Sequence, residues 1–181
     1  IEKSKEQIET IMVGYTHTQQ AQTTTLAHYL KAYIDKLDRD ISRINSYYER
    51  LNKSPMGSAA LTTTGFDINR HSIAEYLAFD GIIKNSWDAV AGADYLAEAA
   101  NVVQLIALNM GRFSQDLLTW ATQEFGSLKL SAGFVQISSI MPQKRNPVGV
   151  EHTRSISSSI VGDANTVIQM IHNTPFGDIV D

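Results

Sequence analysis

The sequence predicts an all-α domain built from long helices, and two observations support that prediction. Apolar residues recur at spacings of three and four over three long segments, which is the pattern of a helix with a buried face. Alternation of apolar and polar residues is too brief anywhere in the 181 residues to predict a sheet. Helices of this length exceed the usual globular mean, so the pattern favours bundle packing.

The first long helix is expected over about residues 24–51, where Leu26, Leu30 and later apolar residues form one face. The polar run GYTHTQQAQTTT precedes it, at residues 14–25, and contains His17. Two interpretations are open for this run. In the first, Thr16 or Thr23 caps the helix and His17 lies on the surface. In the second, the run is denser in polar groups than a cap needs and carries chemistry.

The second long helix is expected over about residues 86–122, after a Ser-, Thr- and Gly-rich loop (52–72) and a shorter helix within 70–79. Asn85 or Ser86 is expected to cap it. Small residues are frequent from Ala89 to Ala107, so this helix is apolar around most of its circumference and must be buried. Partner subunits are the expected cover, and the interior of a larger monomer is the alternative.

The third long helix is expected over about residues 148–171, and the segment that leads into it is unusually polar. Gly126 breaks the second helix, and QISSIMPQKRNPVGVEH follows at residues 136–152. A serine hydroxyl acts as a base or nucleophile only beside a cation, a dipole or another base. Lys144, Asn146 and the free N–H groups at the helix start are suited to a carboxylate or phosphate. A charged capping loop is the alternative, and Glu151 needs a partner histidine to have more than a capping role.

Composition and motifs exclude several other classes. The net charge is −4, so no basic field attracts nucleic acid or an anionic membrane. The absence of cysteine excludes a disulfide scaffold and fits a reducing compartment. The five histidines are scattered and no nucleotide-binding or metal-binding motif occurs, so no metal and no cofactor is implied. The chain opens on Ile1 rather than Met, and we expect it to be a fragment of a longer protein.

Two motifs resemble one known family. The run SSIMPQKRNP (138–147) resembles the signature of the fumarase/aspartase superfamily, Gly-Ser-Ser-x-Met-Pro-x-Lys-x-Asn-Pro. The run GYTHTQQAQ (14–22) is similar to a segment of the argininosuccinate lyase branch, as are SPMGSAAL, DINR and FDGIIKNSWDAV. The resemblance covers nearly the whole chain, residues 1–181, and matches the central helical domain without its N-terminal and C-terminal neighbours.

The resemblance implies a fold, an assembly and a reaction. The long helices would form the multi-helix core of a cytoplasmic homotetramer whose active sites are shared between subunits. The reaction would be anti β-elimination of a succinyl-type substrate with release of fumarate, with argininosuccinate, which yields arginine, as the expected substrate. A lyase with a different succinyl substrate and a non-catalytic, crystallin-like structural relative are the alternatives. The fragment alone is expected to be inactive.

The resemblance also implies roles for individual residues. Ser138 matches the general base, Lys144 the lysine that stabilises the aci-carboxylate, His17 the general acid and Glu151 its carboxylate partner. The expected substrate-binding residues are Thr16, Asn146, Ser139 and Gln22. Residues 126–147 would form a mobile catalytic loop.

The chain departs from the family pattern at several positions. Ile137 stands where the signature has Gly, and a β-branched residue resists the positive φ that glycine allows. The other departures are Gln20 and Thr23 for Arg and Pro, Gly92-Ala93 for Asp-Arg, and Asp178, Ile179 and Val180 where Tyr and Lys are expected after Pro175. The reaction residues therefore match more closely than the residues expected to hold the arginine half.

Overall fold

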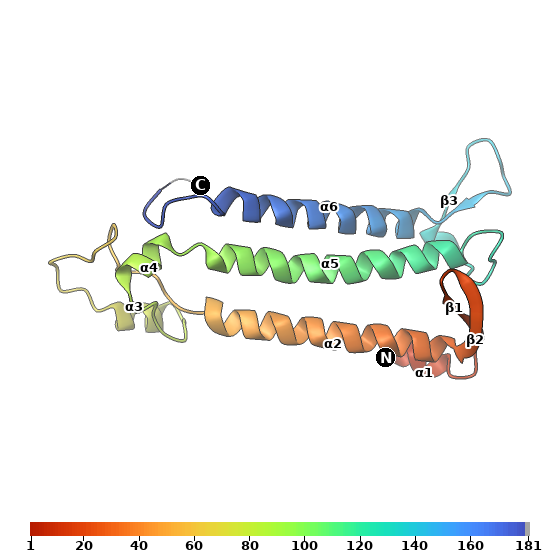
Figure 1. Cartoon of the computed structure of the whole chain (residues 1–181), viewed down its shortest axis with the longest axis horizontal. Helices are drawn as coiled ribbons and strands as arrows, with labels where there is room; N and C mark the ends of the chain where they lie inside the picture. Colours follow the sequence, from red (N-terminus) through yellow and green to blue (C-terminus); the bar gives the residue numbers. More distant parts are fainter. Residues whose placement is uncertain (180–181) are drawn as a thin grey trace. The chain divides into compact units, whose positions relative to one another are not determined.

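The computed structural model describes residues 1–179 and is dominated by helices (Figure 1). The elements, in chain order, are α1 (Glu2–Glu6), β1 (Ile11–Thr16), β2 (Gln19–Thr25), α2 (Leu26–Leu51), α3 (Arg70–Tyr76), α4 (Ser86–Ala91), α5 (Asp94–Trp120), a 3₁₀ turn η1 (Ala132–Phe134), β3 (Gln136–Ile137), β4 (Arg145–Asn146) and α6 (Val148–Ile171). The chain forms two compact units, Ile1–Ser42 and a second that starts at Arg43. The all-α prediction is confirmed, with two short hairpins added.

The first unit contains an antiparallel hairpin that the sequence did not predict. Strand β1 pairs with β2 from Ile11↔Thr25 to Thr16↔Gln19. The register shifts between Val13 and Tyr15, and a Cβ on Gly14 would lie 3.1 Å from the carbonyl oxygen of Gln22. Glycine therefore permits a close backbone approach at this bulge. The expectation of no sheet is wrong here because β2 is polar at every position except Ala21, so it shows no apolar alternation, and backbone hydrogen bonds hold it to β1.

Helix α2 begins directly after this hairpin. The hydroxyl oxygen of Thr25 accepts a hydrogen bond from the backbone N–H of His28 at 3.2 Å. Thr25 therefore caps the helix, and the interpretation in which Thr16 or Thr23 does so is wrong. The rest of the helix matches the predicted segment, and Ile41 on its apolar face is 55% exposed.

The second unit is centred on α5 and α6, which pack side by side (Figure 1). Small residues make the contact: Ala107 and Ser114 of α5 and Ser157 and Ala164 of α6 are buried. Gln104 on α5 also donates hydrogen bonds to α6, to the Val161 carbonyl at 3.3 Å and the Asn165 side chain at 2.9 Å. The small residues let the two helices approach closely, as expected.

Helix α6 covers only part of α5. Leu105 and Leu108 of α5 are 40% and 45% exposed, and Val103 is 48% exposed. Leu105 and Leu108 share an apolar face of α5 that the rest of residues 1–179 leaves partly exposed, and Val103 is exposed on another side of the helix. Within residues 1–179, none of the helices combines the length and apolarity needed to cross a membrane.

The predicted helix over 86–122 is two helices. Asn85 caps α4, and its side chain accepts the backbone N–H groups of Trp87 at 2.8 Å and Asp88 at 3.3 Å. Gly92 then leaves the helix with ψ near 120°, and α5 starts two residues later. A Cβ on Gly92 would lie 2.7 Å from the Asp88 carbonyl oxygen, so only glycine fits this break without a shift. The apolar periodicity continues across Gly92, so the sequence pattern does not indicate the break.

Candidate active site

The β3–β4 hairpin forms one half of the candidate site. Ser138 directly follows Ile137, Lys144 directly precedes Arg145, and Ile137 and Arg145 are partners in the hairpin. The second pair joins Gln136 to Asn146. The hairpin therefore brings Ser138, Lys144 and Asn146 together at one end of the second unit.

Ser138 sits in a specific hydrogen-bonding environment. Its half-buried side-chain oxygen accepts the backbone N–H of Ile140 at 3.2 Å and that of Met141 at 3.0 Å. The Lys144 N–H closes the next turn by donating to the Met141 carbonyl at 3.0 Å. Two N–H donors on one oxygen stabilise negative charge on it. These two bonds hold the Ser138 oxygen in place in the turn, while the neighbouring Ser139 is exposed.

Contacts at both ends anchor this loop. The Arg145 guanidinium donates to the Leu130 carbonyl at 3.3 Å. Phe134 of η1 lies over the first turn of α6, where a Cβ on Gly149 would be 3.6 Å from the Phe134 ring. Ile137 is 74% exposed and extended in β3, and its φ is not positive. The concern that a β-branched residue resists a positive φ here does not apply to this loop.

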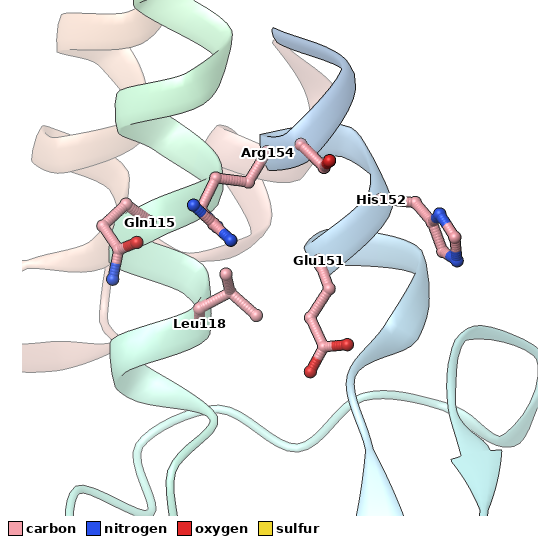
Figure 2. Close-up of a pocket in the computed structure, with 6 residues that line it drawn as sticks. Gln115, Leu118, Glu151, His152 and Arg154 are labelled. Atoms are coloured by element: carbon pink, nitrogen blue, oxygen red, sulfur yellow. The ribbon is translucent and has the colours of Figure 1, made fainter. Parts of the chain in front are cut away.

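Glu151 lies in the first turn of α6, beside a cavity of about 490 Å³. Gln115 and Leu118 of α5 and Arg154 of α6 also line this cavity. Figure 2 shows the Arg154 side chain directed toward Gln115 and the imidazole of His152 on the side of α6 away from α5. In the part of the chain that the structure describes, the Glu151 carboxylate has no hydrogen bond or ion pair. It is available to a partner from elsewhere.

His17 lies at the tip of the β1–β2 hairpin, in the first unit. The loop between Thr16 and Gln19 has two residues, and both have positive φ: 49° for His17 and 63° for Thr18. Such a turn normally takes Asn-Gly, and positive φ is rare for a β-branched residue like Thr18. Non-glycine residues persist in this conformation at a cost in strain, which often accompanies function.

A second cavity, of about 410 Å³, lies between this hairpin and α2. Thr16 and Gln22, two of the expected substrate-binding residues, line it together with His28. His28 was not expected at the site. The one feature of the sequence that could have indicated it is the spacing of four residues between Thr24 and His28 at the start of the helix. In the structure the Thr24 hydroxyl lies 2.9 Å from Nδ1 of His28.

The expected residues therefore fall into two groups. Ser138, Ser139, Lys144, Asn146 and Glu151 belong to the second unit, and Thr16, His17 and Gln22 belong to the first. Each group is brought together by a hairpin or by the helix that follows it.

The perturbed titratable groups lie in a different part of the second unit. The Arg50 guanidinium donates to both carboxylate oxygens of Glu98 and holds the pKa of Glu98 below its usual value. Burial raises the pKa of the nearby Tyr47 hydroxyl. Tyr47, Arg50 and Glu98 all line a cavity of about 450 Å³ near the start of α5. None of the expected catalytic residues lines this cavity. This ion pair ties α2 to α5.

Comparison with known proteins identifies relatives of the whole chain. A family model described as "Lyase" matches residues 1–162. Argininosuccinate lyase 2 of Agrobacterium fabrum is 44% identical over 181 residues, which is 100% of this chain and 36% of that protein. Argininosuccinate lyase of Methanothermobacter thermautotrophicus is 42% identical over 168 residues, 93% of this chain and 36% of that protein. The chain thus spans little more than a third of these relatives.

Solved structures show the same architecture. EDDS lyase in complex with formate superposes with a TM-score of 0.96 at 34% identity, covering 99% of this chain and 36% of that one. A variant of EDDS lyase with bound fumarate gives a TM-score of 0.95 at 34% identity, with the same coverage. Class II fumarase from Schistosoma mansoni gives 0.85 at 22% identity, covering 97% of this chain and 42% of that one, which is a likeness of fold.

Proposed function

The chain belongs to the lyase family of the fumarase/aspartase superfamily, and from that premise we propose that the protein containing it cleaves a succinyl-type substrate by anti β-elimination and releases fumarate. Argininosuccinate is the proposed substrate, with arginine as the second product, because the relatives at 42% and 44% identity carry the name argininosuccinate lyase. A small substrate with two carboxylates also agrees with the fumarate bound to an EDDS lyase variant of the same fold.

The observation that carries the proposal is the pair of N–H donors on the Ser138 oxygen, at 3.2 and 3.0 Å. A serine removes a proton from carbon only as an alkoxide, and these donors stabilise that charge. In the proposed first step Ser138 takes the proton from the carbon next to a substrate carboxylate. The electron pair left behind moves into that carboxylate. Lys144 and Asn146, at the same end of the hairpin, offer a cation and an amide to this charge.

The second step breaks the bond between carbon and the leaving nitrogen. The electron pair returns from the carboxylate to form the double bond of fumarate, and the nitrogen leaves with the bonding pair and takes up a proton. His17, oriented by Glu151, is the proposed donor of that proton. Thr16, Gln22 and Ser139 are proposed to hold the substrate.

A homotetramer with shared active sites is part of the proposal. The Glu151 carboxylate has no partner in the described part of its own chain, and apolar side chains such as Leu105 and Leu108 remain exposed on α5. Association of chains would bury that face and bring His17 of one subunit to Glu151 of another. We also propose a cytoplasmic location.

EDDS lyase supports a second candidate, in which the leaving amine differs from arginine. The observation that favours this candidate is the TM-score of 0.96 between this chain and EDDS lyase. A backbone so similar to this one therefore also occurs in a lyase that is not named argininosuccinate lyase. Gly92 agrees with this alternative, because the position has no room for the Asp that argininosuccinate lyases usually have there.

The test is fumarate release by the full-length protein, offered argininosuccinate, adenylosuccinate, aspartate and malate. Release from argininosuccinate supports the first candidate, and release from another compound alone supports the second. If intact oligomers release fumarate from none of them, the enzyme proposal is wrong and the structural, crystallin-like role gains support.

A further inference from the structure

The cavity between the β1–β2 hairpin and α2 contains a histidine that the proposed elimination does not use. The cavity measures about 410 Å³, and His28 lines it opposite the strand residues Thr16 and Gln22. All three belong to the first unit. Because two proposed substrate-binding residues line the cavity, the His28 imidazole is a further candidate for contact with the substrate.

The cavity offers many neutral hydrogen-bonding groups and no fixed charge. Its polar lining consists of hydroxyl groups, one amide and one imidazole, from Tyr15, Thr16, Thr23, Thr24, Tyr29, Gln22 and His28. No Asp, Glu, Lys or Arg lines it. An isolated carboxylate or ammonium group would find no counter-ion among these residues. A zwitterion has both donors and acceptors and no net charge, and therefore fits this lining better.

A local hydrogen bond fixes the orientation of the His28 ring. Its Nδ1 lies 2.9 Å from the Thr24 hydroxyl, and this is the ring contact that orients the imidazole. The Nε2 atom has no hydrogen bond within residues 1–179. A bond at one ring nitrogen sets the orientation and leaves the other nitrogen for a ligand.

We propose that His28 determines substrate specificity by binding the α-amino-acid end of the leaving half of the substrate through Nε2. This inference rests on the proposed function, in which Lys144 and Asn146 bind the succinyl half and leave the amine-bearing half to other residues. The end of a leaving arginine carries an α-ammonium and an α-carboxylate, which is the zwitterion that the cavity suits.

Two substitutions at His28 separate ligand binding from a structural role. His28→Gln keeps a nitrogen near the position of Nε2, and His28→Asn keeps one near Nδ1, which retains the bond to Thr24. In the full-length protein we expect His28→Asn to raise the KM for argininosuccinate and the calorimetric Kd for free arginine by about tenfold, the worth of one hydrogen bond. We expect kcat, and inhibition by fumarate, to stay close to wild type. His28→Gln should bind arginine nearly as wild type does.

The proposal would be overturned if His28→Gln weakened arginine binding more than His28→Asn does. If His28→Asn behaves as wild type and His28→Gln does not, His28 acts only through Thr24. Unchanged arginine binding in both variants, or no arginine binding by wild type, would also overturn it. Thr24→Val, compared with Thr24→Ser, provides a second test that keeps the imidazole: only the Val variant should weaken arginine binding, and equal binding would contradict the role of Thr24.

Calorimetry with arginine also distinguishes this inference from the proposed function. If wild-type protein releases no fumarate but binds arginine in a way that depends on His28, the lyase proposal is wrong and the arginine-binding role of His28 is supported. If it releases fumarate and arginine binding does not depend on His28, the role of His28 is wrong and the lyase proposal is supported.

Discussion

The side-chain oxygen of Ser138 accepts the backbone N–H of Met141 at 3.0 Å, three residues further along the loop between α5 and α6. With the N–H of Ile140 at 3.2 Å, this bond makes the turn itself a site for negative charge. In the proposed mechanism the loop therefore does two things: it supplies the serine, and it folds so that backbone dipoles stabilise the serine's reactive form. Loss of the hydroxyl should affect chemistry far more than assembly.

Ser138→Ala is expected to lower kcat for fumarate release by at least about a hundredfold, the usual range for loss of a general base. Steady-state kinetics on the full-length protein measures this, and size-exclusion chromatography should show an unchanged oligomer. Ser131→Ala is the matched control, because Ser131 is exposed, makes no side-chain cap hydrogen bond and has no role in the proposed site, so its loss should cost much less activity. Equal kcat for the Ser138 variant and wild type would rule out Ser138 as the base.

Thr18→Gly is expected to stabilise the protein, because Thr18 adopts a φ of 63° in the hairpin turn. A β-branched residue in this region costs about 1 kcal/mol or more, and glycine does not incur that cost. The thermal midpoint of the full-length protein should rise. Thr23→Gly in β2, where φ is not positive, is the control and should lower the midpoint. A lower midpoint for Thr18→Gly would show that the turn is not strained.

Helix positions in this fold could be predicted from the sequence, because apolar spacing records which face is buried. The segment predicted at about residues 148–171 is α6 at Val148–Ile171, and that at about 24–51 is α2 at Leu26–Leu51. The break at Gly92 could not be predicted, since it depends on a 2.7 Å approach to the Asp88 carbonyl rather than on periodicity. Strand β2 was missed because QQAQTTT has no apolar alternation.

The candidate site was predicted in part. Ser138, Lys144 and Asn146 were expected from their motif, and the hairpin places them together. The N–H groups of Ile140 and Met141 reach the Ser138 oxygen because of how the turn folds, and this fold could not be predicted from the residue types. The left-handed conformation of His17 was also hidden, because Asn-Gly marks such a turn and His-Thr does not.

Glu98→Gln is expected to destabilise the protein at neutral pH and to have no effect in acid. Arg50 holds the folded-state pKa of Glu98 below its unfolded value. A carboxyl group with a lowered pKa contributes stability that is fully present above the unfolded pKa and is lost as pH falls through the folded pKa. Thermal midpoints measured from pH 7 downward should therefore converge for variant and wild type. The loss should be small, because the pair is partly exposed.

The control for that pH series is Glu124→Gln, since Glu124 has no ion pair in the described part of the chain. Its midpoint should follow the wild-type curve throughout. A difference between Glu98→Gln and wild type that persists unchanged at the lowest pH would show that the Gln variant is destabilised by lost packing rather than by lost charge.

Gly92→Ala is expected to lower the free energy of unfolding by about 1–3 kcal/mol, the range for an added methyl group that forces backbone to move. A Cβ at Gly92 would lie 2.7 Å from the Asp88 carbonyl oxygen, so α4 or α5 has to shift. Gly162→Ala is the matched control: Gly162 lies inside α6, and beyond its own stretch of helix nothing in the described structure lies within 4 Å of an added Cβ. Alanine is the better helix former, so this control should gain up to about 1 kcal/mol. Denaturant unfolding of the full-length protein measures both changes, and a Gly92→Ala variant as stable as the Gly162→Ala variant would mean that the α4–α5 break accommodates a side chain.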